Sequence, residues 1–291
     1  MSISTFLKSA LFLALVAGLG IAVLFTIRMQ DGWSYTIVHS NLEQVSGLIV
    51  ADADIYVTLE TRQQDGQLIR LTADGRQVLV TGLQKPDGLV FTRGQLVYTQ
   101  ESGIKPVNQL AVKDADGTVS KPVALFEANN AEGVDSNEAG DIFVIEDRRD
   151  GRLLRFDARS RLTQVLKDQL IEPEGLCVAS NNRIYYTEKT LGTVYRLLEN
   201  GEALPIIEGL TKPGYLYCNE SSDGIWITED RRHLGRLLFL EDENAELKVI
   251  AESLASPQSI AFVGDDILLA EQGRNRVIRL SRQSHRATEQ L

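Results

Sequence analysis

The stretch Ile171-Glu-Pro-Glu-Gly-Leu-Cys-Val-Ala-Ser-Asn-Asn-Arg-Ile-Tyr-Tyr-Thr-Glu188 decides the fold, because its pattern recurs along the chain. It contains a turn, a short apolar strand, a second turn at Asn181-Asn182, and a second strand that ends in a carboxylate. Asn and Gly turns between β-branched and aromatic runs are typical of antiparallel strands. We find six copies of this pattern, with pivot residues at Gly47, Gly88, Gly133, Gly175, Tyr215 and Ser259.

The spacing of the copies indicates the architecture. Successive pivots are 41, 45, 42, 40 and 44 residues apart, and a period of roughly 40–45 residues with four strands per repeat is typical of propeller blades. A single blade cannot bury both of its faces, so the blades must stack around an axis. The sequence therefore predicts an all-β, six-bladed β-propeller over residues 34–285, with blades that start near 44, 85, 130, 172, 212 and 256.

The last copy lacks a fourth strand, because a polar tail follows its third strand-like piece at 276–280. An open ring would expose an unpaired strand edge. The strand-like segment Ser34-Tyr-Thr-Ile-Val-His-Ser40 precedes the first copy and belongs to no other blade. We therefore predict that residues 34–40 form the outer strand of the last blade.

The composition excludes several classes of function. The chain has 30 basic and 40 acidic residues, a formal net charge of −10, which would repel a phosphate backbone and disfavours nucleic-acid binding. It contains no GxSxG, HExxH, GxxxxGK or dinucleotide-type glycine motif. A serine triad and a nucleotide-dependent enzyme are therefore disfavoured.

An uncharged run of 19 residues, 9–27, lies between Lys8 and Arg28. As a helix, this run is long enough to span a hydrocarbon core of about 30 Å. A cleaved secretory signal is the alternative, but the run is long for one and no small-x-small cleavage site follows it. We predict an N-terminal transmembrane anchor within residues 1–30, a short tether at 28–33 with Trp33 at the membrane interface, and a propeller on the periplasmic or extracytoplasmic side.

The two cysteines, Cys177 and Cys218, occupy first-strand positions in adjacent copies. Cys177 follows Leu176 by one residue, whereas Cys218 follows the equivalent Leu216 by two, so strand alternation points the two side chains to opposite faces. We therefore expect two buried thiols rather than a disulfide. No Cys and His spacing indicates a zinc site.

Carboxylates precede three consecutive pivots. In an antiparallel blade, the first strand begins at the face where the second strand ends, and the innermost strand borders the axis. The residues before the pivots should therefore ring the central channel: Ser46, Asp87, Glu132, Glu174, Gly214 and Gln258. Neighbouring buried acids need a partner to stay ionised, and oxygen ligands suit Ca²⁺ or Mg²⁺. We predict that Asp87, Glu132 and Glu174 bind a divalent cation, with Ca²⁺ preferred; solvated or hydrogen-bonded turn residues are the alternative.

A second acidic layer follows the second strands and should line the mouth of the same face. It comprises Glu146, Glu188, Glu229 and Glu271, each at the end of a second strand. One residue after this position, four blades carry a further acid: Glu60, Glu101, Asp147 and Asp230. The loops after Glu146 and Glu229 share an Asp-Arg-Arg sequence whose arginines balance these acids or bind an anion; a salt-bridged, solvated rim is the alternative. We expect proton transfer by Glu188, Glu229 and His233, although a loop histidine is also common at a surface. We expect ligand binding by Ser46, Glu146, Tyr215, Gln258 and Glu271.

The sequences Lys85-Pro-Asp-Gly-Leu, Pro173-Glu-Gly-Leu and Ile184-Tyr-Tyr-Thr-Glu188 resemble the calcium-dependent six-bladed propellers. These are the senescence marker protein/gluconolactonase/luciferin-regenerating enzyme family and the related strictosidine synthase-like and paraoxonase-like proteins. The resemblance covers residues 41–280, and some strictosidine synthase-like members also carry a single N-terminal anchor. It implies one divalent ion on the axis, bound here by Asp87, Glu132 and Glu174, that polarises a lactone carbonyl and activates water.

The chain also departs from this family. No Asn precedes any pivot, Ser46 stands where a ligand acid is usual, and the substrate-binding arginine motif of the gluconolactonases has no clear match. Similar turns occur in propellers without activity. Two functions therefore stay open: a membrane-anchored, divalent-metal-dependent hydrolase of small lactones or esters, and a non-catalytic propeller. The second would bind a small ligand or serve as an accessory or scaffold subunit of a membrane protein complex.

Overall fold

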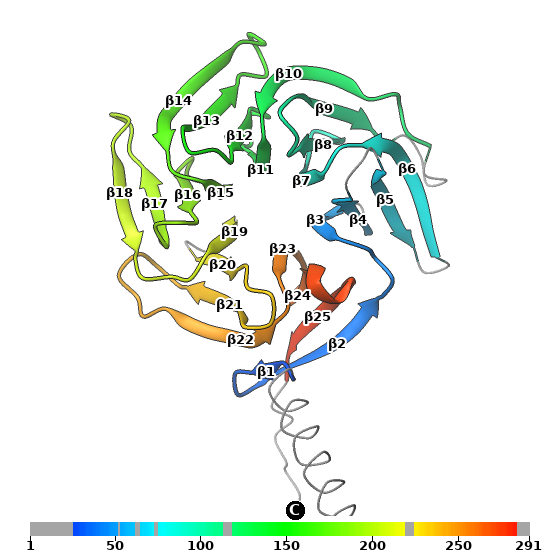
Figure 1. Ribbon diagram of the computed structural model, residues 1–291, viewed down its shortest axis with the longest axis vertical. Helices are drawn as coiled ribbons and strands as arrows, with labels where there is room; N and C mark the ends of the chain where they lie inside the picture. The colour runs from blue at the N-terminus through cyan, green and yellow to red at the C-terminus, as the bar shows by residue number, and fades with distance from the viewer. Residues whose placement is uncertain are drawn as a thin grey trace, which may run out of the picture.

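Six antiparallel sheets surround a central axis in the computed structural model (Figure 1), which describes residues 26–283 except 52, 62–64, 73–74, 113–117 and 219–223. The prediction of an all-β, six-bladed propeller is therefore confirmed. The predicted anchor lies outside the described residues, apart from its last few positions. Within the part of the chain that is described, no helix has the length and apolar character needed to cross a bilayer.

Each blade runs outward from the axis in chain order. Blades 1 to 3 are β3–β6 (Val45–Ala51, Asp54–Leu59, Gly66–Thr72, Gly75–Leu83), β7–β10 (Pro86–Thr92, Gln95–Gln100, Ile104–Ala111, Val123–Asn129) and β11–β14 (Ala131–Ser136, Ile142–Glu146, Gly151–Phe156, Thr163–Leu170). Blades 4 and 5 are β15–β18 (Pro173–Val178, Ile184–Glu188, Thr193–Leu197, Ala203–Ile207) and β19–β22 (Pro213–Cys218, Ile225–Glu229, Gly235–Leu240, Lys248–Leu254). Blade 6 contains β23–β25 (Pro257–Val263, Asp266–Glu271, Arg276–Arg282), with the short 3-10 helix η1 (Gln272–Arg274) after β24.

The ring closes as predicted. Strand β2 (Trp33–His39) pairs antiparallel with β25 and supplies the outer strand of blade 6, from Trp33 opposite Arg282 to His39 opposite Val277. The first and last segments of the propeller thus share one sheet, which removes an exposed edge.

The predicted tether at residues 28–33 is wrong. Arg28–Met29 forms β1, a fifth strand on blade 5 that pairs with β22. Trp33 belongs to β2, where its ring meets Trp226 edge-on at 6.2 Å between centroids and lies 5.1 Å from the Arg282 guanidinium. The N-terminal segment therefore joins blades 5 and 6, and Trp33 packs on the propeller instead of standing free between propeller and membrane.

Close contact between neighbouring blades at the hub fixes the residues that precede each pivot. A Cβ on Gly47 would lie 2.2 Å from the Asp87 carbonyl oxygen, and one on Gly88 would lie 2.3 Å from the Glu132 carbonyl oxygen, so only glycine fits there. Thr58 and Thr99, near the ends of the second strands, donate to the same two carbonyls at 2.7 Å. Blades 1 and 2 thereby position Asp87 and Glu132, the acids of the blades that follow them.

The expectation of two free thiols is also wrong, because Cys177 and Cys218 form a disulfide with 5.6 Å between their Cα atoms. The two side chains do point to opposite faces of their own blades. Blades stack face to face, however, so opposite faces of adjacent blades look at each other. The same relation links Asp135 of β11 to the backbone N–H of Val178 in β15, at 2.7 Å.

Candidate functional site

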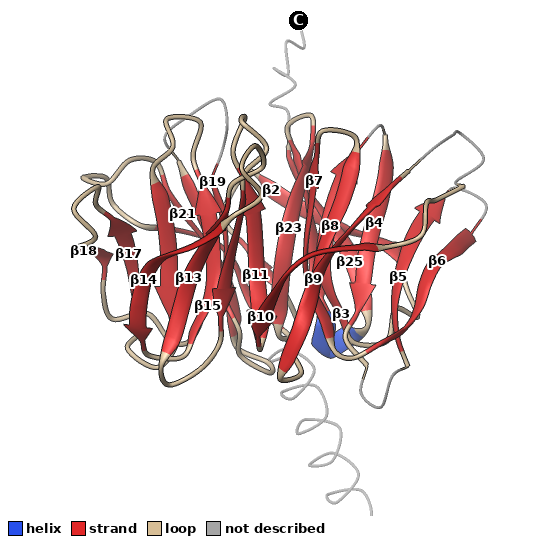
Figure 2. Cartoon of the chain, turned by 90° about the horizontal axis from the view of Figure 1, so that it is seen from above, coloured by secondary structure: helices blue, strands red, loops and turns tan. Residues whose placement is uncertain are grey.

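The first strands begin, and the second strands end, at one face of the propeller, which η1 marks in Figure 2. We call it the acidic face. The acids Asp87, Glu132 and Glu174 occupy the start of β7, β11 and β15, and all three are buried. Ser46 and Gln258 occupy the equivalent places in β3 and β23 and are buried too.

Three carboxylates meet at this face. One oxygen from each of Asp87, Glu101 and Glu132 lies within 4.8 Å of the other two. The Glu132 Oε2 atom is buried without a hydrogen-bond partner among the described residues. Three converging carboxylates, one of which has a buried oxygen without a hydrogen bond, form a donor set that suits a hard divalent cation such as Ca²⁺. We call these three residues the carboxylate cluster.

Burial makes the cluster costly to ionise. It raises the pKa of Asp87, even though hydrogen bonds from Ser46 and Tyr215 favour the charged form. Burial also raises the pKa of Glu132 well above its ordinary value; Lys189 opposes this shift, while Asp87 and Asp147 add to it. Without a cation, Asp87 and Glu132 therefore retain protons more readily than free carboxyl groups do.

Glu60 borders the cluster and is poised to titrate near neutrality. Burial first, and then the Asp87 charge, raise the pKa of Glu60 to about 7, against the lowering effect of Lys85. The Lys85 ammonium lies 3.2 Å from Glu60 and also pairs with Glu101. Gln272 donates to Glu60 at 2.8 Å. A carboxyl group with such a pKa can take up a proton at physiological pH.

Glu174, predicted as a cation ligand, does not belong to the three-residue cluster. It pairs with Lys189, whose ammonium also lies 3.9 Å from Asp147. Glu101 joins Asp87 and Glu132 in its stead. The repeat pattern could have identified Lys189 as a partner for these acids. It is the one lysine at a repeat position where the other blades carry Glu60, Glu101, Asp147, Asp230 and Gln272.

Tyr215, predicted to bind a ligand, reaches across the axis. Its hydroxyl donates to the Asp87 carboxylate, although β19 and β7 belong to opposite blades of the ring (Figure 1). The Tyr215 oxygen also lies 3.1 Å from Ser46 Oγ, which itself donates to Asp87. Burial raises the pKa of Tyr215 well above its ordinary value, so the phenol remains a donor at neutral pH. The ring of Tyr215 therefore lies beneath the cluster in the channel.

The second acidic layer has a structural role. The four glutamates that end second strands, and Gln100 in the equivalent place, each accept a hydrogen bond from the backbone N–H that lies four residues before the pivot of the same blade; the acceptors are Gln100, Glu146, Glu188, Glu229 and Glu271. Arginines of the third strands or the preceding turn complete the arrangement, with Arg152 on Glu146, Arg236 on Glu229, and Arg274 and Arg276 on Glu271. These side chains fix the loops that lead into the blades.

Two of the three expected proton acceptors, Glu188 and Glu229, have partners outside the cluster. Glu188 and Glu229 contact backbone amides, and Glu229 also contacts Arg236. His233 lies partly buried in the turn between β20 and β21. Of the four loop arginines expected to balance the acids, Arg148, Arg149 and Arg232 are exposed and Arg231 is partly buried; Glu146 and Glu229 pair instead with Arg152 and Arg236 at the starts of β13 and β21.

No protein-family model and no curated protein sequence matches the chain. Solved propellers do match it in fold. A luciferin-regenerating enzyme superposes with a TM-score of 0.69 at 10% identity, over 86% of this chain and 95% of that one. A chain described as a gluconolactonase candidate gives 0.67 at 12% identity, over 88% and 97%.

A third similar structure has another chemistry. A catalytically inactive virginiamycin B lyase from Staphylococcus aureus, solved with quinupristin, gives a TM-score of 0.61 at 13% identity, over 88% of this chain and 99% of that one. At these identities the comparisons establish a shared architecture. Because the shared fold carries different activities, the function must be argued from the site itself.

Proposed function

We propose that the protein holds a divalent cation, Ca²⁺ foremost, at Asp87, Glu101 and Glu132, and hydrolyses small lactones or esters at the acidic face. The observation that carries the proposal is the convergence of three carboxylates, two of them buried, one of which has a buried oxygen without a hydrogen bond. The similar solved structures include a protein described as a gluconolactonase candidate, which agrees with this reaction class.

A bound divalent cation would polarise the substrate carbonyl and lower the pKa of water. The chain's own residues supply the remaining functions. Glu60, whose pKa is about 7 in the cation-free protein, accepts a proton at its carboxylate. Lys85 and Gln272 hold that carboxylate in place. Tyr215 lies across the channel beneath Asp87, so substrate reaches the cluster from the acidic face.

A non-catalytic propeller is the second proposal, and the lysines favour it. Lys85 pairs with Glu101, and Lys189 pairs with Glu174, so part of the acidic charge is balanced without an ion. In that case the acidic face is a salt-bridged structural layer, and the protein binds a small ligand or a subunit of a membrane complex.

We further propose that residues 9–27 anchor the protein in a membrane, with the propeller on the periplasmic or extracytoplasmic side. The uncharged run of 19 residues supports the anchor. The disulfide between Cys177 and Cys218 supports the side, because disulfides persist mainly in oxidising compartments. Alkaline extraction and protease accessibility of the full chain in vesicles would test both statements.

Hydrolysis of phenyl acetate and dihydrocoumarin by the full chain tests the enzyme proposal. We expect turnover that EDTA abolishes, that Ca²⁺ restores, and that Glu101→Gln lowers by about 100-fold or more, since several kcal/mol of transition-state stabilisation depends on the cation. Glu138→Gln, an exposed acid at the other face, is the matched control and should retain wild-type rates. Cation binding without turnover of either substrate would favour the non-catalytic proposal.

A further inference from the structure

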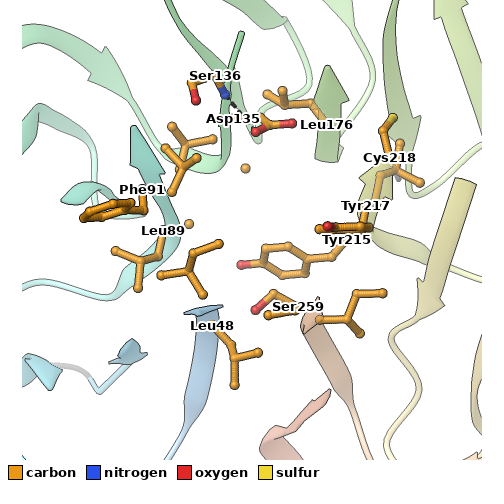
Figure 3. Close-up of a pocket in the computed structure, with 18 of the residues that line it drawn as sticks. Leu48, Leu89, Phe91, Asp135, Ser136, Leu176, Tyr215, Tyr217, Cys218 and Ser259 are labelled. Atoms are coloured by element: carbon orange, nitrogen blue, oxygen red, sulfur yellow. Dashed lines mark hydrogen bonds between the residues drawn. The ribbon is translucent and has the colours of Figure 1, made fainter. Parts of the chain in front are cut away.

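A cavity of about 300 Å³ lies in the channel at the end opposite the acidic face. The first strands run toward this end, and the cavity lies between them (Figure 3). Most of its lining residues have apolar side chains, with Leu48, Leu89, Val134, Leu176 and Ile260 contributed by five different blades, although polar atoms make up about half of the exposed lining surface. The volume is at the lower end of the roughly 300–1,000 Å³ that is typical of small-molecule sites, so a compact ligand would fill it.

One charged side chain lies among these lining residues. Among the described residues that line the cavity, Asp135 is the only one with an ionisable acid or base of the Asp, Glu, Lys, Arg or His type. Its carboxylate accepts the backbone N–H of Ser136 at 2.8 Å and that of Val178 in the next blade at 2.7 Å. These bonds fix its position. A carboxylate has about four acceptor sites, and Asp135 makes at least one further interaction besides these two bonds, so an ammonium group would share the carboxylate with its existing partners.

Aromatic rings complete the lining. Phe91, Tyr217 and Phe262 contribute to the walls, with Tyr217 and Phe262 packed at 4.9 Å between centroids. Tyr215 reaches toward the centre of the cavity (Figure 3). Aromatic faces attract cations, and the net charge of −10 favours their approach. An anion would find no cationic side chain among the described lining residues.

The cavity is distinct from the carboxylate cluster. Tyr215 lines it on one side and donates a hydrogen bond to Asp87 on the other. None of the three cluster residues lines the cavity. A ligand bound here would therefore be independent of a cation at the acidic face.

We propose that this cavity binds a small organic monocation, an ammonium group on an aryl or alkyl body, with the ammonium at Asp135 and the body against the aromatic and aliphatic walls. The proposal does not depend on the hydrolase proposal, because it concerns the other end of the channel.

Three probes of one shape and different charge test the proposal by isothermal titration calorimetry: 4-phenylbutylamine, 4-phenylbutan-1-ol and 4-phenylbutanoate. We expect the amine to bind about tenfold or more tightly than the alcohol, since hydrogen bonds between charged groups are roughly twice as strong as neutral ones, and the carboxylate to bind weakest. Equal affinity for all three probes, or no binding of the amine, would overturn the proposal.

Variants locate the site. Asp135→Asn should remove the advantage of the amine over the alcohol, while Asp265→Asn, an exposed acid in the turn between β23 and β24, should leave it unchanged. Ser136→Lys provides a second test if Asp135→Asn fails to fold, because it places an ammonium at the partly buried rim beside Asp135 and should abolish amine binding. Unchanged amine binding in a folded Ser136→Lys protein would contradict the assignment.

Calcium distinguishes the two ends of the channel. Excess Ca²⁺ and the Glu101→Gln variant should both leave the affinity for 4-phenylbutylamine unchanged. Displacement of the amine by Ca²⁺, or its loss in Glu101→Gln, would place the amine at the acidic face and overturn the proposal.

Discussion

The Tyr215 hydroxyl of blade 5 donates a hydrogen bond across the propeller axis to the Asp87 carboxylate of blade 2. This bond joins two residues that are 128 positions apart in the chain. It also separates a carboxylate cluster at one end of the channel from a cavity with mostly aliphatic and aromatic lining residues at the other. The separation explains why one channel can present two unlike chemistries.

Loss of the Tyr215 hydroxyl should weaken the protein. Tyr215→Phe keeps the ring in the channel but leaves the buried Asp87 without one of its two side-chain donors. We expect a loss of about 1–3 kcal/mol in the free energy of unfolding, measured by urea denaturation at pH 7. Tyr35→Phe, on the outer strand β2, is the control. Equal stability of Tyr215→Phe and wild type would show that the bond is absent in solution.

The cation-free protein should lose stability as the pH rises from about 5 to 8. Glu60 has an ordinary pKa of 4.5 and a folded-state pKa of about 7, so the native state binds more protons than the unfolded state between these values. The free energy of unfolding therefore falls as the pH increases through that window. Glu60→Gln should flatten the profile, and saturating Ca²⁺ should offset the fall. A rising profile in EDTA would contradict the raised pKa.

The pivot glycines should resist substitution. A Cβ on Gly88 would lie 2.3 Å from the Glu132 carbonyl oxygen, which is part of the backbone and cannot move aside alone. We expect Gly88→Ala to cost about 1–3 kcal/mol or more in urea denaturation. In Gly214→Ala, the nearest atom is a Glu174 side-chain oxygen at 3.0 Å, so the loss should be smaller. Equal effects of the two variants would contradict the hub geometry.

Removing the arginine that pairs with a buried second-strand glutamate should destabilise the protein more than neutralising the glutamate itself. Arg236→Met leaves the fully buried Glu229 carboxylate without its cationic partner and should cost about 3 kcal/mol, discounted somewhat because Arg236 is partly exposed. Glu229→Gln retains an acceptor for the Thr211 N–H and should cost less. The hydrolysis rate of the Glu229→Gln variant should match that of the wild-type protein. A folded Glu229→Gln protein without activity would support a catalytic role for this residue.

Repetition made the architecture predictable. The six pivots and the unpaired segment at 34–40 determine the blade number and the closure, because each blade repeats one pattern and an open edge is unfavourable. Strand alternation within a single blade does not predict the disulfide, because Cys177 and Cys218 meet between two adjacent blades. The place of Glu101 in the carboxylate cluster and the pairing of Lys189 with Glu174 depend on side-chain directions at the hub, which repeat spacing alone does not specify.

The occupancy of the carboxylate cluster is the central claim, and metal analysis tests it most directly. The full chain would be stripped with EDTA, dialysed to equilibrium against Ca²⁺ at pH 7.5 and analysed for bound metal, alongside Glu132→Gln and the exposed-acid control Glu138→Gln. We predict one Ca²⁺ per chain in wild type and control, and its loss in Glu132→Gln. Absence of bound metal in wild type, or equal occupancy in all three proteins, would contradict the proposed cation site.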